Sequence, residues 1–168
     1  FLRSFLVRRP PGDTVGFGAY PDGHPSIPDG VLVEALAEKQ AMIADAGLEG
    51  YLVTQMCFAP GTIADWLVAR RAAGITLPCL LGVPGAVDPA RLLSISLRLG
   101  VGVSARYLKK NRLAVLRLLS PRRYDPNKLV VPLSAVADQL DVAGTHCFTF
   151  NSAEATEAWR QKSLARLA

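Results

Sequence analysis

Three side chains that could bind a flat heterocycle stand at the ends of two apolar runs. Tyr20 ends the run at residues 15–20, His24 follows it in a turn rich in Pro and Gly, and Gln55 stands near the end of the run at residues 51–56. A tyrosine ring can stack on a cofactor, and a buried amide offers a paired donor and acceptor to a pterin or flavin edge. A packing tyrosine and a solvated or capping histidine are alternatives that stay open.

A charged side chain lies on an otherwise apolar helical stripe. Lys39 shares this stripe with Leu32, Leu36 and Ile43, so its ammonium group either extends to solvent or reaches an anion. The sequence contains no nucleophile triad, no pair of carboxylates at strand ends and no cluster with metal-ligand spacing. We therefore assign no catalytic residue and no metal site.

Four short runs are typical of strands: residues 15–20, 51–56, 79–84 and 145–151. Three are almost uninterrupted in apolar residues, as in parallel sheets that helices cover, and helical patterns lie between them. This alternation predicts an α/β fold, either doubly wound or closed into a barrel. No Gly-rich dinucleotide fingerprint follows the first run, and a complete (β/α)8 TIM barrel takes about 250 residues. We therefore expect half of such a barrel, forming one domain over residues 1–168.

Capping residues mark several helix boundaries. Thr62 with Asp65 predicts an N-terminal cap for the helix after the second strand. Asp88 followed by Pro89 predicts another cap after the third strand. Further helices are predicted over residues 104–119, over residues 126–140 and after Asn151.

The composition is that of a globular protein. Of the 168 residues, 50% are hydrophobic and 20% are charged, with a net charge of +5. Much of the positive charge falls within residues 106–123, which indicates a solvated helix face or an anion site. Nucleic acid is the least favoured partner, because no recognisable binding module is present. Three cysteines at no metal spacing are expected to be buried thiols.

The chain is expected to be cytoplasmic and to lie off the membrane. No apolar run approaches the roughly 18 residues that a membrane helix needs, and the first ten residues lack a signal-peptide cleavage site. The first residue is Phe1 rather than Met, so we expect an N-terminal portion to be missing.

Four short motifs resemble those of methylenetetrahydrofolate reductases in order and spacing. AYPDGHP at residues 19–25 is similar to the fifth-strand signature of that family. DAG at residues 45–47 followed by VTQ at residues 53–55 is similar to its sixth-strand segment, and AGI at residues 73–75 to a later turn. HCFTFN at residues 146–151 is similar to the final-strand motif. The resemblance covers nearly the whole chain and implies strands 5–8, the C-terminal half of the barrel.

The resemblance also implies site residues. Tyr20 and His24 would contact FAD, and Gln55 would contact the folate. Lys39 lies one turn before the place of a family lysine near the flavin. Arg91 falls where a family glutamine meets the folate.

The implied reaction reduces 5,10-methylenetetrahydrofolate to 5-methyltetrahydrofolate, in one-carbon metabolism and methionine biosynthesis. NADH or NADPH reduces the flavin, and the flavin reduces the folate. The family's proton-donating Glu, and the Asp that faces flavin and pterin, lie in earlier strands that this chain does not contain. The alternative is a non-catalytic or repurposed barrel that binds folate or an anion. Assembly into a homo-oligomer stays open.

Overall fold

A computed structural model of the chain describes residues 6, 14–88, 90–92, 94–95 and 125–165. Its strands are β1 (Thr14–Ala19), β2 (Glu49–Thr54), β3 (Cys79–Pro84) and β4 (Val142–Phe148). They form a four-stranded sheet in the order β1-β2-β3-β4, and each neighbouring pair is parallel. The four predicted strands and the parallel α/β class are confirmed.

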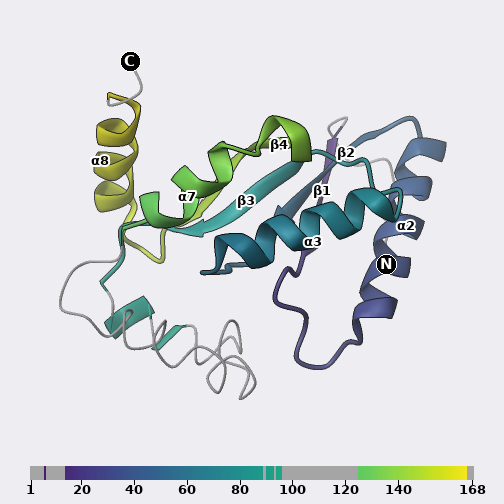
Figure 1. Cartoon of the computed structure of the whole chain (residues 1–168), viewed down its shortest axis with the longest axis horizontal. Coiled ribbons are helices and arrows are strands. Elements are labelled where there is room, and N and C mark those ends of the chain that lie inside the picture. The colour runs from purple at the N-terminus through teal and green to yellow at the C-terminus, as the bar shows by residue number, and fades with distance from the viewer. Residues whose placement is uncertain (1–5, 7–13, 89, 93, 96–124, 166–168) are drawn as a thin grey trace.

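Helices separate the strands along the chain (Figure 1). They are α2 (Asp29–Asp45), α3 (Pro60–Ala72), α7 (Asn127–Ser134), the short 3-10 helix η1 (Asp138–Leu140) and α8 (Ala153–Leu164). The helix predicted over residues 126–140 is therefore divided into α7 and η1. The helix predicted over residues 104–119 lies outside the described residues.

One predicted cap is confirmed and the other is wrong. The Asp88 carboxylate accepts hydrogen bonds from the backbone N–H groups of Ala90 and Arg91, at 3.0 and 3.1 Å. Helix α3 begins at Pro60, two residues before Thr62, and its N-cap forms no side-chain hydrogen bond. Proline suits the first helical turn because that turn leaves its N–H groups without intrahelical partners.

One face of the sheet packs against the helices, because alternate strand residues there are apolar and buried. Residues of β1, β2 and β3 join residues of α2, α3 and α7 in one core: Phe17, Leu52, Leu81, Leu36, Ile43, Ile63, Leu67, Leu129 and Leu133. Figure 1 shows α3 and α7 lying across this face. Each such large side chain stabilises the fold by about 1.5–3 kcal/mol, so the helix layer holds the sheet in place.

The opposite face of β1 and β2 is less covered. Gly16 and Gly18 are exposed, and Tyr51 and Val53 are half-buried. A Cβ atom on Gly16 would lie 2.7 Å from the Tyr51 ring, so glycine leaves room for that ring. In a doubly wound sheet the strand order reverses at a switch point. Among the described strands, the spatial order instead follows the order along the chain.

A single guanidinium group joins three elements at the amino ends of β3 and β4. Arg71, in the last turn of α3, donates to the carbonyl oxygens of Ile75 and Leu77, both at 2.8 Å. It also donates to the carbonyl oxygens of Leu140, at 2.9 Å, and Asp141, at 3.3 Å. These acceptors lie on the segments that lead into β3 and β4. Arg71 therefore fixes where both strands begin relative to α3.

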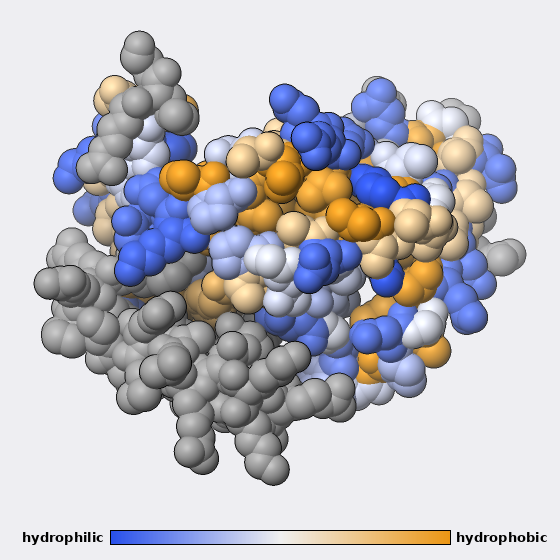
Figure 2. All heavy atoms as spheres, viewed as in Figure 1, coloured by the Kyte–Doolittle hydropathy of each residue, from blue (hydrophilic) through white to orange (hydrophobic). Residues whose placement is uncertain are grey.

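The outer surface of the helix layer carries exposed apolar side chains, which Figure 2 shows gathered over this layer. Val68 of α3 and Val131 of α7 are 56% and 62% exposed. A large share of the surface of a folded protein is ordinarily apolar. Among the described helices, none combines the length and the apolar character that crossing a membrane requires.

Candidate functional site

The turns after the four strands lie at one edge of the sheet, because all four strands are parallel. We call this edge the carboxyl rim; it comprises residues 20–25, 55–58, 85–88 and 149–152. The Gln55 N–H donates to the Ala19 carbonyl at 2.7 Å, and the Gly85 N–H donates to the Phe148 carbonyl at 3.0 Å. These bonds tie the β2 turn to β1 and the β3 turn to β4. Tyr20, His24 and Gln55 all belong to this rim.

The first turn brings Tyr20 and His24 together. The Gly23 N–H donates to the Tyr20 carbonyl at 3.0 Å, and glycine suits this turn because its φ is +79°. The two rings meet edge to face, with centroids 5.1 Å apart and planes at 87°. The His24 Nδ1 atom accepts a hydrogen bond from the Ser26 N–H at 3.2 Å. This leaves Nε2 as the ring donor of a neutral imidazole.

Gln55 is half-buried, and the turn that follows it orients its amide. The Oε1 atom accepts a hydrogen bond from the Met56 N–H at 3.0 Å. The amide oxygen thus has a hydrogen-bond partner, the backbone N–H group of the next residue. Because the oxygen is held, the direction of the Nε2 donor is fixed as well.

The β2 turn contacts rim turns on both sides. On one side, the Cys57 side chain lies next to the Asp22 carboxyl group, and its thiol donates to the Ala59 carbonyl at 3.7 Å. On the other, Met56 packs in a small cluster with Val87 and Leu92, against which Phe58, Phe148 and Phe150 also pack. The turn that carries Gln55 is therefore the centre of the rim.

Asp22 is the rim residue that sequence reasoning missed. Asp22 is exposed as a residue, but its carboxyl group lies against the β2 turn. The resulting desolvation raises the pKa of that carboxyl group, and the neighbouring Cys57 thiol offsets part of the rise. Its position in the sequence could have indicated a rim residue, because Asp22 stands between Tyr20 and His24 in the same turn. Its contact with Cys57 joins residues 35 positions apart, and local pattern does not reveal such a contact.

Two of the three cysteines are fully buried, as expected, and Cys147 is half-buried. Burial raises the pKa of Cys57, and the neighbouring Asp22 carboxylate raises it further. Burial raises the pKa of Cys79 to about 12. These two thiols are therefore inert packing groups. In the described part of the chain, no three His, Cys, Asp or Glu side chains gather as ligands for a metal ion.

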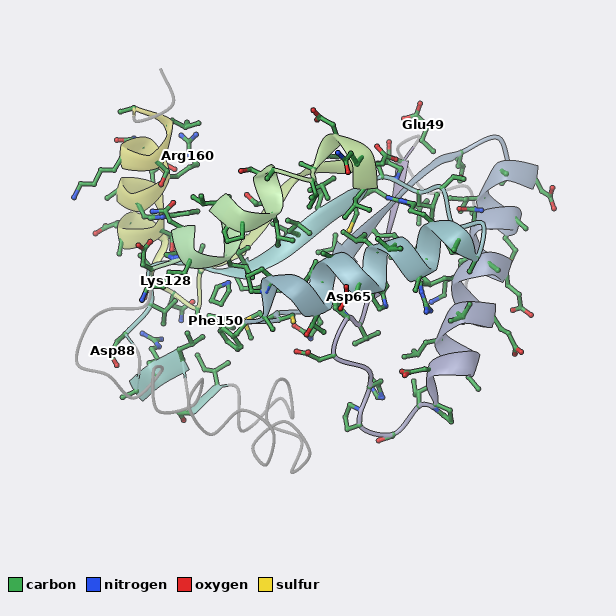
Figure 3. All side chains as sticks on the ribbon, viewed as in Figure 1. Glu49, Asp65, Asp88, Lys128, Phe150 and Arg160 are labelled. Carbon is green, nitrogen blue, oxygen red and sulfur yellow. The ribbon has the colours of Figure 1, made fainter. Side chains whose placement is uncertain are left out.

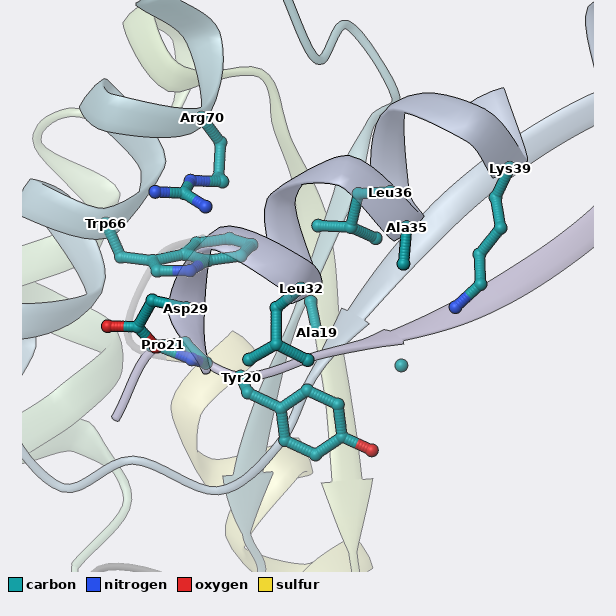
Figure 4. Close-up of a pocket in the computed structure, with 11 residues that line it drawn as sticks. Ala19, Tyr20, Pro21, Asp29, Leu32, Ala35, Leu36, Lys39, Trp66 and Arg70 are labelled. Carbon is teal, nitrogen blue, oxygen red and sulfur yellow. The ribbon is translucent and has the colours of Figure 1, made fainter. Parts of the chain in front are cut away.

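Lys39 lines a hollow between β1, α2 and α3 (Figure 4). Tyr20, Leu32, Leu36 and Trp66 share its lining, and the volume is about 80 Å³. The Lys39 ammonium lies 5.8 Å from the centre of the Phe17 ring. Sites that enclose a drug-sized ligand have volumes of roughly 300–1,000 Å³. This hollow therefore has room for a small anion but not for a flavin ring system.

A second cation stands at the other end of the same hollow. Arg70 lies over the Trp66 ring, with 5.7 Å between its guanidinium carbon and the ring centre. Figure 4 shows Arg70 beside Trp66 at one end and Lys39 at the other, with apolar side chains of α2 between them. The two positive groups therefore do not converge on one point.

Arg91 follows β3 and is exposed. Its backbone N–H belongs to the Asp88 cap. The neighbouring Leu92 shares a cluster with Met56, and Met56 is next to Gln55. Arg91 and Gln55 thus stand on turns that pack together, and within the described residues no hydrogen bond or ion pair joins their side chains.

A scan of the chain against protein-family models finds no match. The likeness to methylenetetrahydrofolate reductases therefore rests on the short motifs and stays a prediction.

Proposed function

We propose that the chain is half of a (β/α)8 barrel, and that the protein reduces 5,10-methylenetetrahydrofolate to 5-methyltetrahydrofolate. Electrons would pass from NADH or NADPH through FAD. The strand order supports the barrel, because right-handed crossovers between successive neighbouring strands keep the helices on one face of the sheet. Active sites of such barrels lie at the carboxyl ends of the strands.

The observation that carries the proposal is the shared rim of Tyr20, His24 and Gln55. The 2.7 Å hydrogen bond from the Gln55 N–H to the Ala19 carbonyl sets the two strand ends side by side. An aromatic face, a ring N–H and an amide are thus available along one edge. This donor set suits a flat ring that lies across the rim rather than inside the Lys39 hollow.

Each residue has a role in this proposal. FAD, when bound, would accept a hydride from the nicotinamide and donate it to the folate. Tyr20 would pack against the flavin ring, and the His24 Nε2–H group would donate a hydrogen bond to it. Gln55 would hold the pterin edge with its oriented amide, which limits the ring to positions within reach of the flavin.

Activity of the full-length protein tests the proposal. We expect NADH or NADPH to be oxidised when 5,10-methylenetetrahydrofolate is supplied, and added FAD to increase the rate. The matched control omits the folate. If neither nucleotide is oxidised, with or without FAD, the reductase proposal is refuted.

Gln55→Ala tests the assignment of the pterin edge. The substitution removes the oriented amide, so we expect affinity for 5-methyltetrahydrofolate to fall about tenfold, because one hydrogen bond contributes about 1.5 kcal/mol or less. Calorimetric titration measures this change. Thr76→Ala is the control, since the Thr76 side chain is exposed and lies before β3, away from the rim. Unchanged affinity in Gln55→Ala would show that this amide does not bind folate.

A second candidate is a barrel that binds folate or a small anion without hydride chemistry. The volume of about 80 Å³ beside Lys39 favours it, because that space suits a phosphate-sized group. Under this reading the protein binds 5-methyltetrahydrofolate or inorganic phosphate but oxidises no nucleotide. Lys39→Met would then weaken phosphate binding and leave folate binding unchanged.

A further inference from the structure

The turn after β4 has an unusual residue at its centre. The Ser152 N–H donates to the Thr149 carbonyl at 2.8 Å and closes the turn. The two central residues, Phe150 and Asn151, have φ values of +46° and +61°. Turns with two such residues are dominated by Gly, Asn and Asp. Asn151 follows that preference, whereas a bulky residue such as Phe150 is an outlier in this conformation.

The turn directs the Phe150 ring onto a row of aromatic rings. Phe150 stacks on Phe148 with 6.1 Å between centroids and 19° between planes. Phe148 meets His146 edge to face at 4.8 Å. A Cβ atom on Gly82 would clash with the Thr54 carbonyl of β2 and would lie 2.8 Å from the Phe148 ring. Glycine on β3 therefore leaves space for this row, whose last member, Phe150, belongs to the carboxyl rim. Figure 3 labels Phe150 near the carboxyl end of β3.

Packing alone does not explain the residue. Phe150 packs beside the small cluster that contains Met56, Val87 and Leu92, and such satellite clusters are common under loops. The side chain of Phe150 nevertheless keeps solvent access, since the residue is only half-buried. Strained backbone that persists at the working edge of a fold suggests a functional constraint. The cluster against which Phe150 packs contains Met56, which follows Gln55 in the β2 turn.

We propose that Phe150 is a stacking residue that binds a planar aromatic ring of the ligand at the carboxyl rim. The inference rests on the proposed function, which supplies two sources of such a ring. One is the folate, through its pterin or aminobenzoyl ring, and the other is the nicotinamide nucleotide. In either case the ring would extend the row of Phe148 and Phe150 by one more stacked member.

The test compares Phe150→Leu and Phe150→Asn in the full-length protein with Phe17→Leu. Phe17 is a core residue, 7% exposed, on the face of the sheet that the helices cover, so its substitution controls for lost packing. The probes are 5-methyltetrahydrofolate, p-aminobenzoylglutamate, 6-carboxypterin and NADH, each titrated by calorimetry. Thermal unfolding midpoints are measured alongside, because asparagine tolerates the left-handed backbone and keeps the protein folded if leucine does not.

We expect both Phe150 variants to bind 5-methyltetrahydrofolate or NADH about tenfold more weakly, as loss of one aromatic contact implies. The two fragment probes identify which folate ring is held, and a loss confined to NADH identifies the nucleotide. Phe17→Leu should bind as the wild type does. If the wild type binds the ligands and both Phe150 variants bind them within twofold, this inference is overturned and the proposed function stands. If the wild type binds none of them, both fail.

Discussion

Replacement of Arg71 tests how the amino ends of β3 and β4 are held. Its guanidinium donates to the carbonyls of Ile75, Leu77 and Leu140 at 2.8–2.9 Å, and its side chain is only 20% exposed. In Arg71→Met these carbonyls lose their partner while the aliphatic stem keeps its packing. The ion pair with Asp141 adds little, because its atoms are 3.9 Å apart and Asp141 is 60% exposed.

The expected loss of stability follows from the three carbonyls. An acceptor left without a partner destabilises a protein by about 1–3 kcal/mol. We take the lower end of this range, since water can reach some of the carbonyls once the guanidinium is gone. The sum is about 3–4 kcal/mol, which corresponds to a fall of roughly 10 °C in the unfolding midpoint for a chain of this size.

Urea unfolding followed by circular dichroism measures the free energy, and calorimetry gives the midpoint. The matched control is Arg70→Met, one residue earlier on α3. Arg70 has a cation–π contact with Trp66, so its loss should destabilise the protein by only about 0.5–1 kcal/mol. Equal losses in the two variants would refute the reasoning, because they would show that the carbonyl contacts of Arg71 add nothing to ordinary packing.

Two further predictions concern the rim. In Gly85→Ala the new Cβ atom would clash with the Thr156 hydroxyl and lie 2.8 Å from its methyl group, so we expect a loss of about 1–3 kcal/mol in urea unfolding. Gly61→Ala, with open space on α3, should instead be neutral or up to about 1 kcal/mol more stable. Burial raises the pKa of Asp22 above its ordinary 3.8, so its folded form holds the proton more tightly than the unfolded chain. Stability from this group is therefore full below pH 3.8 and is lost as pH rises through the raised pKa. Asp22→Asn should remove that loss, and identical midpoints for variant and wild type from pH 3 to pH 8 would contradict the assignment.

Local pattern was enough to predict the strands and the cap formed by Asp88. Runs of apolar residues with polar or Gly ends are set by neighbours along the chain, and so is a carboxylate that caps the next N–H groups. The same local reasoning failed at Thr62, because Pro60 begins α3 earlier without any side-chain cap. It also missed the division of residues 126–140, where α7 ends at Ser134.

The contacts that make up the candidate site depend on which strands are neighbours. Asp22 meets Cys57 only because β1 lies beside β2, and Arg71 reaches Leu140 only because β3 lies beside β4. Tyr20 and His24 were predicted as a pair because they share one turn, whereas the position of Lys39 over Phe17 required helix α2 to pack against β1. Periodicity reports the face on which a side chain lies. It carries no information about the partner across that face, because the partner is selected by packing between segments far apart in the sequence.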